Sequence, residues 1–130
     1  VMDESFKGCI NVQYATKFPE NVQSIREAYA NCTSLETAST IPEKVKDISQ
    51  CYTGCNSLSG VLEINTDTKS FSGVLRNAVT MGDILSISGN SGNLLAIQQD
   101  SESSNIILAD PEAAANQNKR MLAEEAAINY

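Results

Sequence analysis

The chain has 130 residues, enough for one ordinary domain, and 42% of them are hydrophobic while 19% are charged. The net charge of -7 argues against binding to nucleic acid or to anionic lipid, because both need a basic surface. Histidine is absent, which excludes Ser-His-Asp and Cys-His catalysis and imidazole metal ligands. No stretch approaches about 18 uninterrupted apolar residues, so we expect no membrane insertion.

In chain order, the first feature is an internal repeat. Cys9, Cys32 and Cys55 mark its 23-residue step, and several sets of aromatic and aliphatic residues follow the same step. A unit of this length buries its apolar side chains only against neighbouring units, so like residues fall into columns. The further columns are Phe6, Tyr29 and Tyr52; Val12, Leu35 and Leu58; Ala15, Ala38 and Val61; Phe18, Ile41 and Ile64; and Ile25, Ile48 and Phe71.

Each repeat is predicted to contain one short strand, over residues 12–18, 35–41, 58–64 and 81–87, with a weaker fifth strand near 105–108. We expect positions 12, 15 and 18 of the first strand, and their equivalents, to face the core. Six core residues should be almost fully buried: Cys32, Leu35, Ile41, Cys55, Leu58 and Ile64. The outward positions then include Gln13, Tyr14, Thr16, Lys17, Glu36, Thr37, Ser39, Thr40, Ser59, Leu62 and Glu63.

The two ends of the chain differ in character. The chain begins in mid-repeat, which predicts either further repeats before residue 1 or a boundary introduced by cutting. Towards the other end, residues 86–93 are rich in turn formers and residues 100–104 are polar. Asp110-Pro111-Glu112 is typical of a helix start, and strong helix formers follow it. We therefore divide the chain into a repeat region at 1–110 and a C-terminal helix at 111–130. This helix is either a cap or linker, or a contact with a neighbouring domain or subunit.

The segment Asn31–Pro42, NCTSLETASTIP, resembles the BspA-type leucine-rich repeat of bacterial surface proteins. In that family a Cys-x-Ser-Leu element precedes a short strand and an Ile-Pro or Leu-Pro step, and Gly54–Gly60, GCNSLSG, repeats the element. The 23-residue period also lies in the leucine-rich-repeat range of about 20 to 29. We therefore predict an α/β fold, a leucine-rich-repeat solenoid of about five coils with a C-terminal helix. The resemblance implies an adhesion or recognition protein that is extracellular or at the cell surface.

Cysteines and carboxylates are the remaining candidates for chemistry. The cysteine spacings do not match the Cys-x-x-Cys pairs of zinc sites, so stacked free thiols, a disulfide and a metal site are ranked in that order. Glu20 and Glu43 share a column, which the repeat itself explains, although paired acids also serve glycoside hydrolysis. We expect no catalytic residues, no metal and no cofactor.

The sequence thus predicts a non-catalytic module that binds a protein or glycan on its outward strand face. Tyr14 is the expected anchor, because aromatic residues dominate binding hot spots. The alternative is a structural or assembly segment of a larger particle, such as a phage tail or fibre. The candidate ligand-binding residues are Tyr14, Thr16, Lys17, Glu36, Thr37, Thr40 and Glu63.

Overall fold

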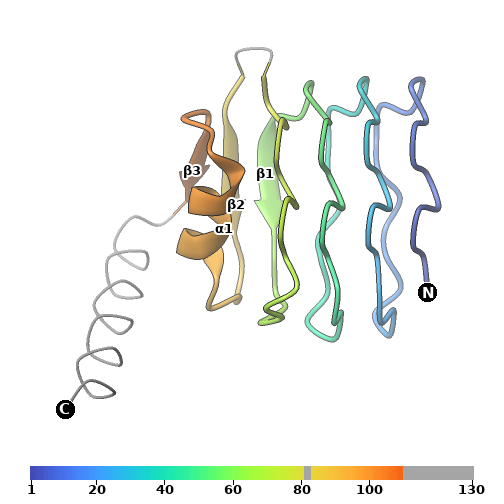
Figure 1. The fold of residues 1–130 in the computed structure, drawn as a ribbon, viewed down its shortest axis with the longest axis vertical. Helices are drawn as coiled ribbons and strands as arrows, with labels where there is room; N and C mark the ends of the chain where they lie inside the picture. Colours follow the sequence, from blue (N-terminus) through green and yellow to red (C-terminus); the bar gives the residue numbers. More distant parts are fainter. Residues whose placement is uncertain (81–82, 110–130) are drawn as a thin grey trace.

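A computed structural model describes residues 1–80 and 83–109 of the chain. Within them lie β1 (Gly60–Glu63), β2 (Leu85–Ser88), α1 (Leu94–Ser101) and β3 (Ile106–Leu108). The strands form one parallel sheet in the order β1-β2-β3. Figure 1 shows the earlier chain segments running side by side from the N-terminus towards this sheet. The helix predicted at 111–130 lies outside the described residues.

The predicted fold class is wrong. The described residues form a small domain with three parallel strands and one helix, not a leucine-rich-repeat solenoid of about five coils. Residues 12–18 and 35–41 do not form strands, and only isolated bridges such as Tyr14–Thr37 join them to their neighbours.

The pairing inside the sheet also departs from the repeat step. Gly60 pairs with Leu85 rather than with Asp83, its equivalent in the next unit. Leu85 in turn pairs with Ile106 rather than with Leu108. The three strands therefore do not continue the columns of the earlier units residue for residue.

Tyrosine hydroxyls explain why the first two predicted strands are not continuous. The Thr16 N–H donates to the Tyr29 hydroxyl at 2.9 Å, and the Ser39 N–H donates to the Tyr52 hydroxyl at 3.0 Å. These N–H groups are therefore not available to a neighbouring strand, and each ladder ends after one bridge. The rings themselves stack, with centroids 5.0 Å apart between Phe6 and Tyr29 and 5.6 Å apart between Tyr29 and Tyr52.

On the other side of the chain path, four segments are joined by regular backbone hydrogen bonds. We call residues 1–8, 24–31, 47–54 and 70–77 the back segments. Twelve bonds join them, each running from an N–H group of one segment to a carbonyl oxygen of the next. Examples are Met2 to Ser24 at 2.9 Å and Gly54 to Arg76 at 2.9 Å. All twelve bonds point the same way along the stack, unlike a parallel β-ladder, in which each strand both donates and accepts.

Two positions of every back segment have a positive φ. The last of these positions carries glycine or asparagine in all four segments, the residues that adopt the left-handed region most readily. The sequence repeat thus includes a conformational repeat that composition alone does not show. The residues are Glu4, Glu27, Gln50 and Gly73 at one position, and Gly8, Asn31, Gly54 and Asn77 at the other.

The core lies between the back segments and the side of the fold that carries residues 12–18, residues 35–41 and the sheet. All six residues expected to be buried are 0% exposed, so the column assignment is confirmed for them. It is wrong for Val61, Leu62 and Ile84: Val61 is 60% exposed and Ile84 is 56% exposed, whereas Leu62 is 0% exposed. Leu62 precedes Leu75 by the same interval that separates Thr16 from Tyr29. In this third unit an apolar pair replaces the hydroxyl pair, so position 62 turns inward.

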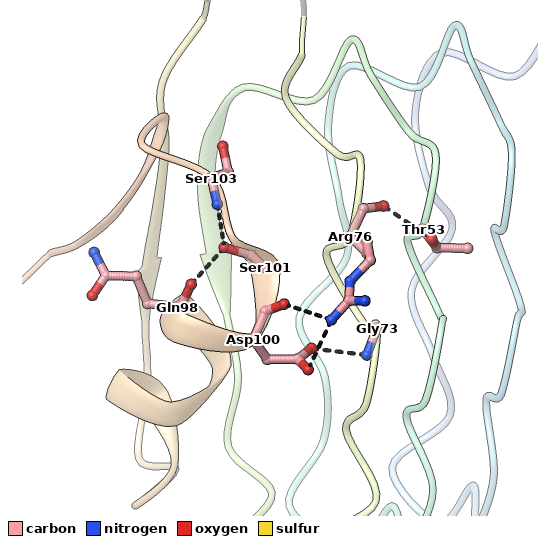
Figure 2. Close-up of polar contacts among 7 residues, drawn as sticks. All are labelled: Thr53, Gly73, Arg76, Gln98, Asp100, Ser101 and Ser103. Carbon is pink, nitrogen blue, oxygen red and sulfur yellow. Dashed lines mark hydrogen bonds and ion pairs between the residues drawn. The ribbon is translucent and has the colours of Figure 1, made fainter.

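Helix α1 follows the last back segment at the spacing of the repeat and ends the series of parallel hydrogen bonds. It lies between the predicted turn-rich break at 86–93 and the predicted polar loop at 100–104, and it overlaps that loop at Asp100 and Ser101. Its Asp100 carboxylate accepts the Gly73 N–H at 2.8 Å, and the Arg76 guanidinium donates to the Asp100 carbonyl oxygen at 3.0 Å (Figure 2). Asp100 therefore takes the place of the next back segment as the acceptor for Gly73.

Candidate functional site

The front face, as we call the outward side of residues 13–17, 36–40 and 59–63, carries all seven predicted ligand-binding residues. Each of the seven is exposed, and Tyr14 has 64% of its surface accessible. Tyr14 pairs in parallel with Thr37, so two of the candidates are direct neighbours across adjacent segments. The face therefore presents an aromatic ring, short hydroxyls and single charges close together.

Two of the seven side chains already have intramolecular partners. The Thr16 hydroxyl lies 3.1 Å from the Tyr29 hydroxyl, and the Glu63 carboxylate accepts the Asn65 amide at 3.2 Å. Among the described residues, the other five form no side-chain hydrogen bond or ion pair. These five can exchange water for a ligand without breaking a bond of the fold: Tyr14, Lys17, Glu36, Thr37 and Thr40.

A groove of about 380 Å³ adjoins the front face where the chain turns towards the back segments. We call it the corner groove. Lys17 and Thr40 belong both to it and to the front face, while most of its other residues were not predicted as site residues. The shared column of Glu20 and Glu43 was the one sequence signal that pointed here. The lining residues are Lys17, Phe18, Glu20, Thr40, Pro42, Glu43, Lys44, Asn65 and Asn90.

The charged side chains of the corner groove do not pair with one another. Lys17, Glu20 and Glu43 form no ion pair or hydrogen bond with any described residue, and the Lys44 ammonium reaches only the Asn21 amide oxygen, at 3.4 Å. Asn65 is held in place, since its amide oxygen accepts the Asn90 N–H at 2.9 Å. The groove thus combines a fixed amide with charged groups that are open to a ligand.

The cysteines are part of the core rather than of a site. All four are free, and those at 32, 51 and 55 are buried. The Cys55 thiol donates to the Tyr29 carbonyl oxygen at 3.0 Å, and burial raises the pKa of this thiol to about 12. Burial also raises the pKa of Cys51 and Cys32. Protonated, buried thiols are poor nucleophiles and poor metal ligands.

The contacts around Asp100 form the second polar cluster, and they are structural. The Asp100 carboxylate lies 3.5 Å from the Arg76 guanidinium as well as accepting the Gly73 N–H, and the Arg76 carbonyl oxygen accepts the Thr53 hydroxyl (Figure 2). These groups already bind one another and hold α1 against the last back segment. The cluster therefore offers a ligand fewer open hydrogen-bonding groups than the front face does.

Comparison with protein-family models, with curated proteins and with solved structures finds no match to this chain. Within residues 1–80 and 83–109, no group of three or more acidic, cysteine or histidine side chains could hold a metal ion. The same described residues include no helix of the length and apolarity needed to cross a membrane.

Proposed function

We propose that this protein is a non-catalytic recognition module that binds a protein or a glycan on its front face. The observation that supports this most directly is the group of five exposed side chains without intramolecular partners, centred on the neighbours Tyr14 and Thr37. An exposed tyrosine offers a large, rigid contact area and is enriched among the residues that dominate binding energy.

The chemistry of the chain supports binding over catalysis. It has no histidine, the usual proton carrier near neutral pH. Its buried thiols have a raised pKa, which disfavours the thiolate that covalent catalysis needs. The proposal also includes a location outside the cell or at its surface, which rests on the resemblance of residues 31–42 to bacterial surface proteins.

Two front-face variants test the proposal. Tyr14→Ala and Glu36→Lys should each weaken attachment to cells, extracellular-matrix proteins or immobilised glycans by at least about tenfold, since hot-spot truncation costs about 2 kcal/mol or more. Because both side chains are exposed, the melting temperature should hardly change.

Matched controls are available away from the face. Thr33→Ala removes another exposed side chain, and Glu102→Lys makes the same charge change as Glu36→Lys on the residue that caps α1. Both controls should attach like the unaltered protein. If the two front-face variants also attach normally while folded, binding does not occur on this face.

A further inference from the structure

We infer that the corner groove binds a neutral sugar, which makes a glycan rather than a protein the ligand of the proposed recognition module. This inference rests on the proposed function and names the class of ligand. It begins from the charges of the groove: Lys17 and Lys44 supply two positive groups, and Glu20 and Glu43 supply two negative groups. The groove is therefore balanced in charge, although the whole chain carries -7.

These four charges lie around one hollow, yet no ion pair forms between them among the described residues. An anionic ligand would meet the two carboxylates, and a cationic ligand would meet the two ammonium groups. A hydroxyl group fits both, because it accepts a hydrogen bond from an ammonium and donates one to a carboxylate. Hydrogen bonds to charged partners are the stronger kind, which favours a ligand with several hydroxyls.

The other lining residues fit the rest of a sugar. Pro42 is half-buried and offers apolar surface to the C–H groups of a pyranose ring, while the buried Phe18 lies at the wall of the groove. Asn65 is fixed by its hydrogen bonds to Asn90 and Glu63, while the Asn90 amide and the Thr40 hydroxyl remain open. A volume of about 380 Å³ lies within the range of about 300 to 1,000 Å³ that small-ligand sites occupy.

The groove also continues onto the front face. Lys17 and Thr40 line the groove, and together with Glu63 they form one row of equivalent repeat positions on the front face. A sugar unit in the groove can therefore be the end of a longer oligosaccharide that extends over this row towards Thr37 and Tyr14. Under this arrangement, groove and face variants weaken attachment to the same glycan.

An NMR titration of the full chain with cellobiose, maltose and lactose tests the inference. We expect at least one of these neutral sugars to shift the side-chain amides of Asn65 and Asn90 and the backbone amide of Thr40, saturating in the millimolar range. Sialyllactose, which is anionic, and lactosamine with a free amino group, which is cationic, should bind more weakly to the same residues. Tighter binding of a charged probe would overturn the inference, and so would the absence of shifts with all three neutral sugars at about 50 mM.

Variants then connect the sugar to the groove. Glu43→Gln and Lys17→Met should each raise the dissociation constant at least fivefold without lowering the melting temperature. Glu102→Gln and Arg26→Met make the same types of change at exposed positions outside the groove and should have no effect. Equal effects of groove and control variants would contradict the assignment.

The two proposals fail in different ways. If Tyr14→Ala abolishes attachment while Glu43→Gln, which changes the groove alone, attaches normally, the front face is the binding site and the sugar assignment is wrong. If the groove variants lose the sugar while Tyr14→Ala and Glu36→Lys attach normally, the sugar assignment holds and the function of the front face is wrong.

Discussion

Single hydroxyl groups decide how neighbouring segments of this protein pair. The Tyr52 hydroxyl accepts the Ser39 N–H at 3.0 Å and donates to the Ser39 carbonyl oxygen at 3.1 Å, so it satisfies both backbone groups of one residue. The Tyr29 hydroxyl accepts the Thr16 N–H in the same way. Each ring also belongs to the aromatic stack, so one side chain serves both packing and polar pairing.

Tyr52→Phe should therefore lower the free energy of unfolding by about 1–3 kcal/mol, because it leaves a backbone N–H without its partner while keeping the ring. Urea unfolding of the variant measures the loss. Tyr14→Phe is the matched control, since the Tyr14 hydroxyl is exposed and forms no hydrogen bond among the described residues. Equal stabilities of the two variants would show that the Ser39 contacts contribute nothing.

The buried thiols make stability depend on pH in the alkaline range. The pKa of Cys55 is about 12 in the folded protein, against an ordinary value of about 8.5 in an unfolded chain. Above pH 8.5 the unfolded chain therefore releases the thiol proton first, and stability falls as pH rises towards 12. Burial raises the pKa of Tyr52 as well, which adds to the fall above about pH 10.

We expect melting temperature to decline between pH 8.5 and 12 and to decline less steeply in Cys55→Ala. Alanine already occupies this column at Ala78, so the substitution removes the titrating group and introduces a side chain that the stack already contains. Thermal unfolding at several pH values measures both slopes. Identical slopes for the two proteins would mean that Cys55 does not titrate differently in the folded state.

Residue columns in the sequence were sufficient to predict burial of six core positions, because identical spacing places identical side chains in one environment. They failed at Val61 and Leu62. Which side chain points inward at positions 61 and 62 depends on whether the aromatic column of the following unit holds a tyrosine or Leu75. A comparison of residues within one column does not detect this dependence between two columns. The corner groove was also missed, since it combines residues from four turns of the chain, and only Glu20 and Glu43 shared a column.

Every back segment has left-handed residues at fixed positions. Two of them, Gly8 and Gly54, distinguish the need for a positive φ from the need for space around the residue. Gly8 and Gly54 both have φ of +73°. An added Cβ at Gly8 would meet no atom within 4 Å, whereas at Gly54 it would overlap the Asn31 amide oxygen. Conformation is thus the same at both positions, and only the surroundings differ.

Gly8→Ala should lower the free energy of unfolding by about 1 kcal/mol, because alanine is disfavoured in the left-handed conformation. Gly54→Ala should lower it by more, because Asn31 must also move. Chemical denaturation of both variants gives the difference directly. The double variant Gly54→Ala with Asn31→Gly should recover part of the extra loss. If Gly8→Ala proves as damaging as Gly54→Ala, backbone conformation alone governs both sites.

Helix α1 is held to the last back segment through Asp100, so this residue should matter more than its position on the surface suggests. Asp100→Ala leaves the Gly73 N–H without its carboxylate acceptor and should lower the free energy of unfolding by about 1–3 kcal/mol. Asp100→Asn keeps an oxygen acceptor and should lose less. Hydrogen exchange at the Gly73 amide is the local measurement, and unchanged protection in Asp100→Ala would rule out this role.

Elements were harder to predict than columns. The repeat suggested a strand in every unit, but strands form only where no tyrosine hydroxyl takes the N–H groups, at β1, β2 and β3. β3 does lie where a weak strand was expected. Helix α1 was missed because its residues follow a cluster of turn formers, although Leu94 to Gln99 are mostly good helix formers.

Across the whole described molecule, the backbone bonds of the back segments link each segment to the next and so hold distant parts of the chain together. They also align the core columns on one side. The sequence period predicted this alignment of side chains. It did not predict the direction of the bonds.

That direction has an electrical consequence. Each peptide unit has a dipole of about 3.5 D, and in the twelve bonds between back segments the N–H groups point towards α1 while their carbonyl acceptors point towards residue 1. The aligned dipoles add, so the α1 end of the stack carries partial positive charge and the opposite end partial negative charge. The Asp100 carboxylate lies at the positive end, bound to the Gly73 N–H. In an α-helix the positive end faces the start of the chain; here it faces the later residues.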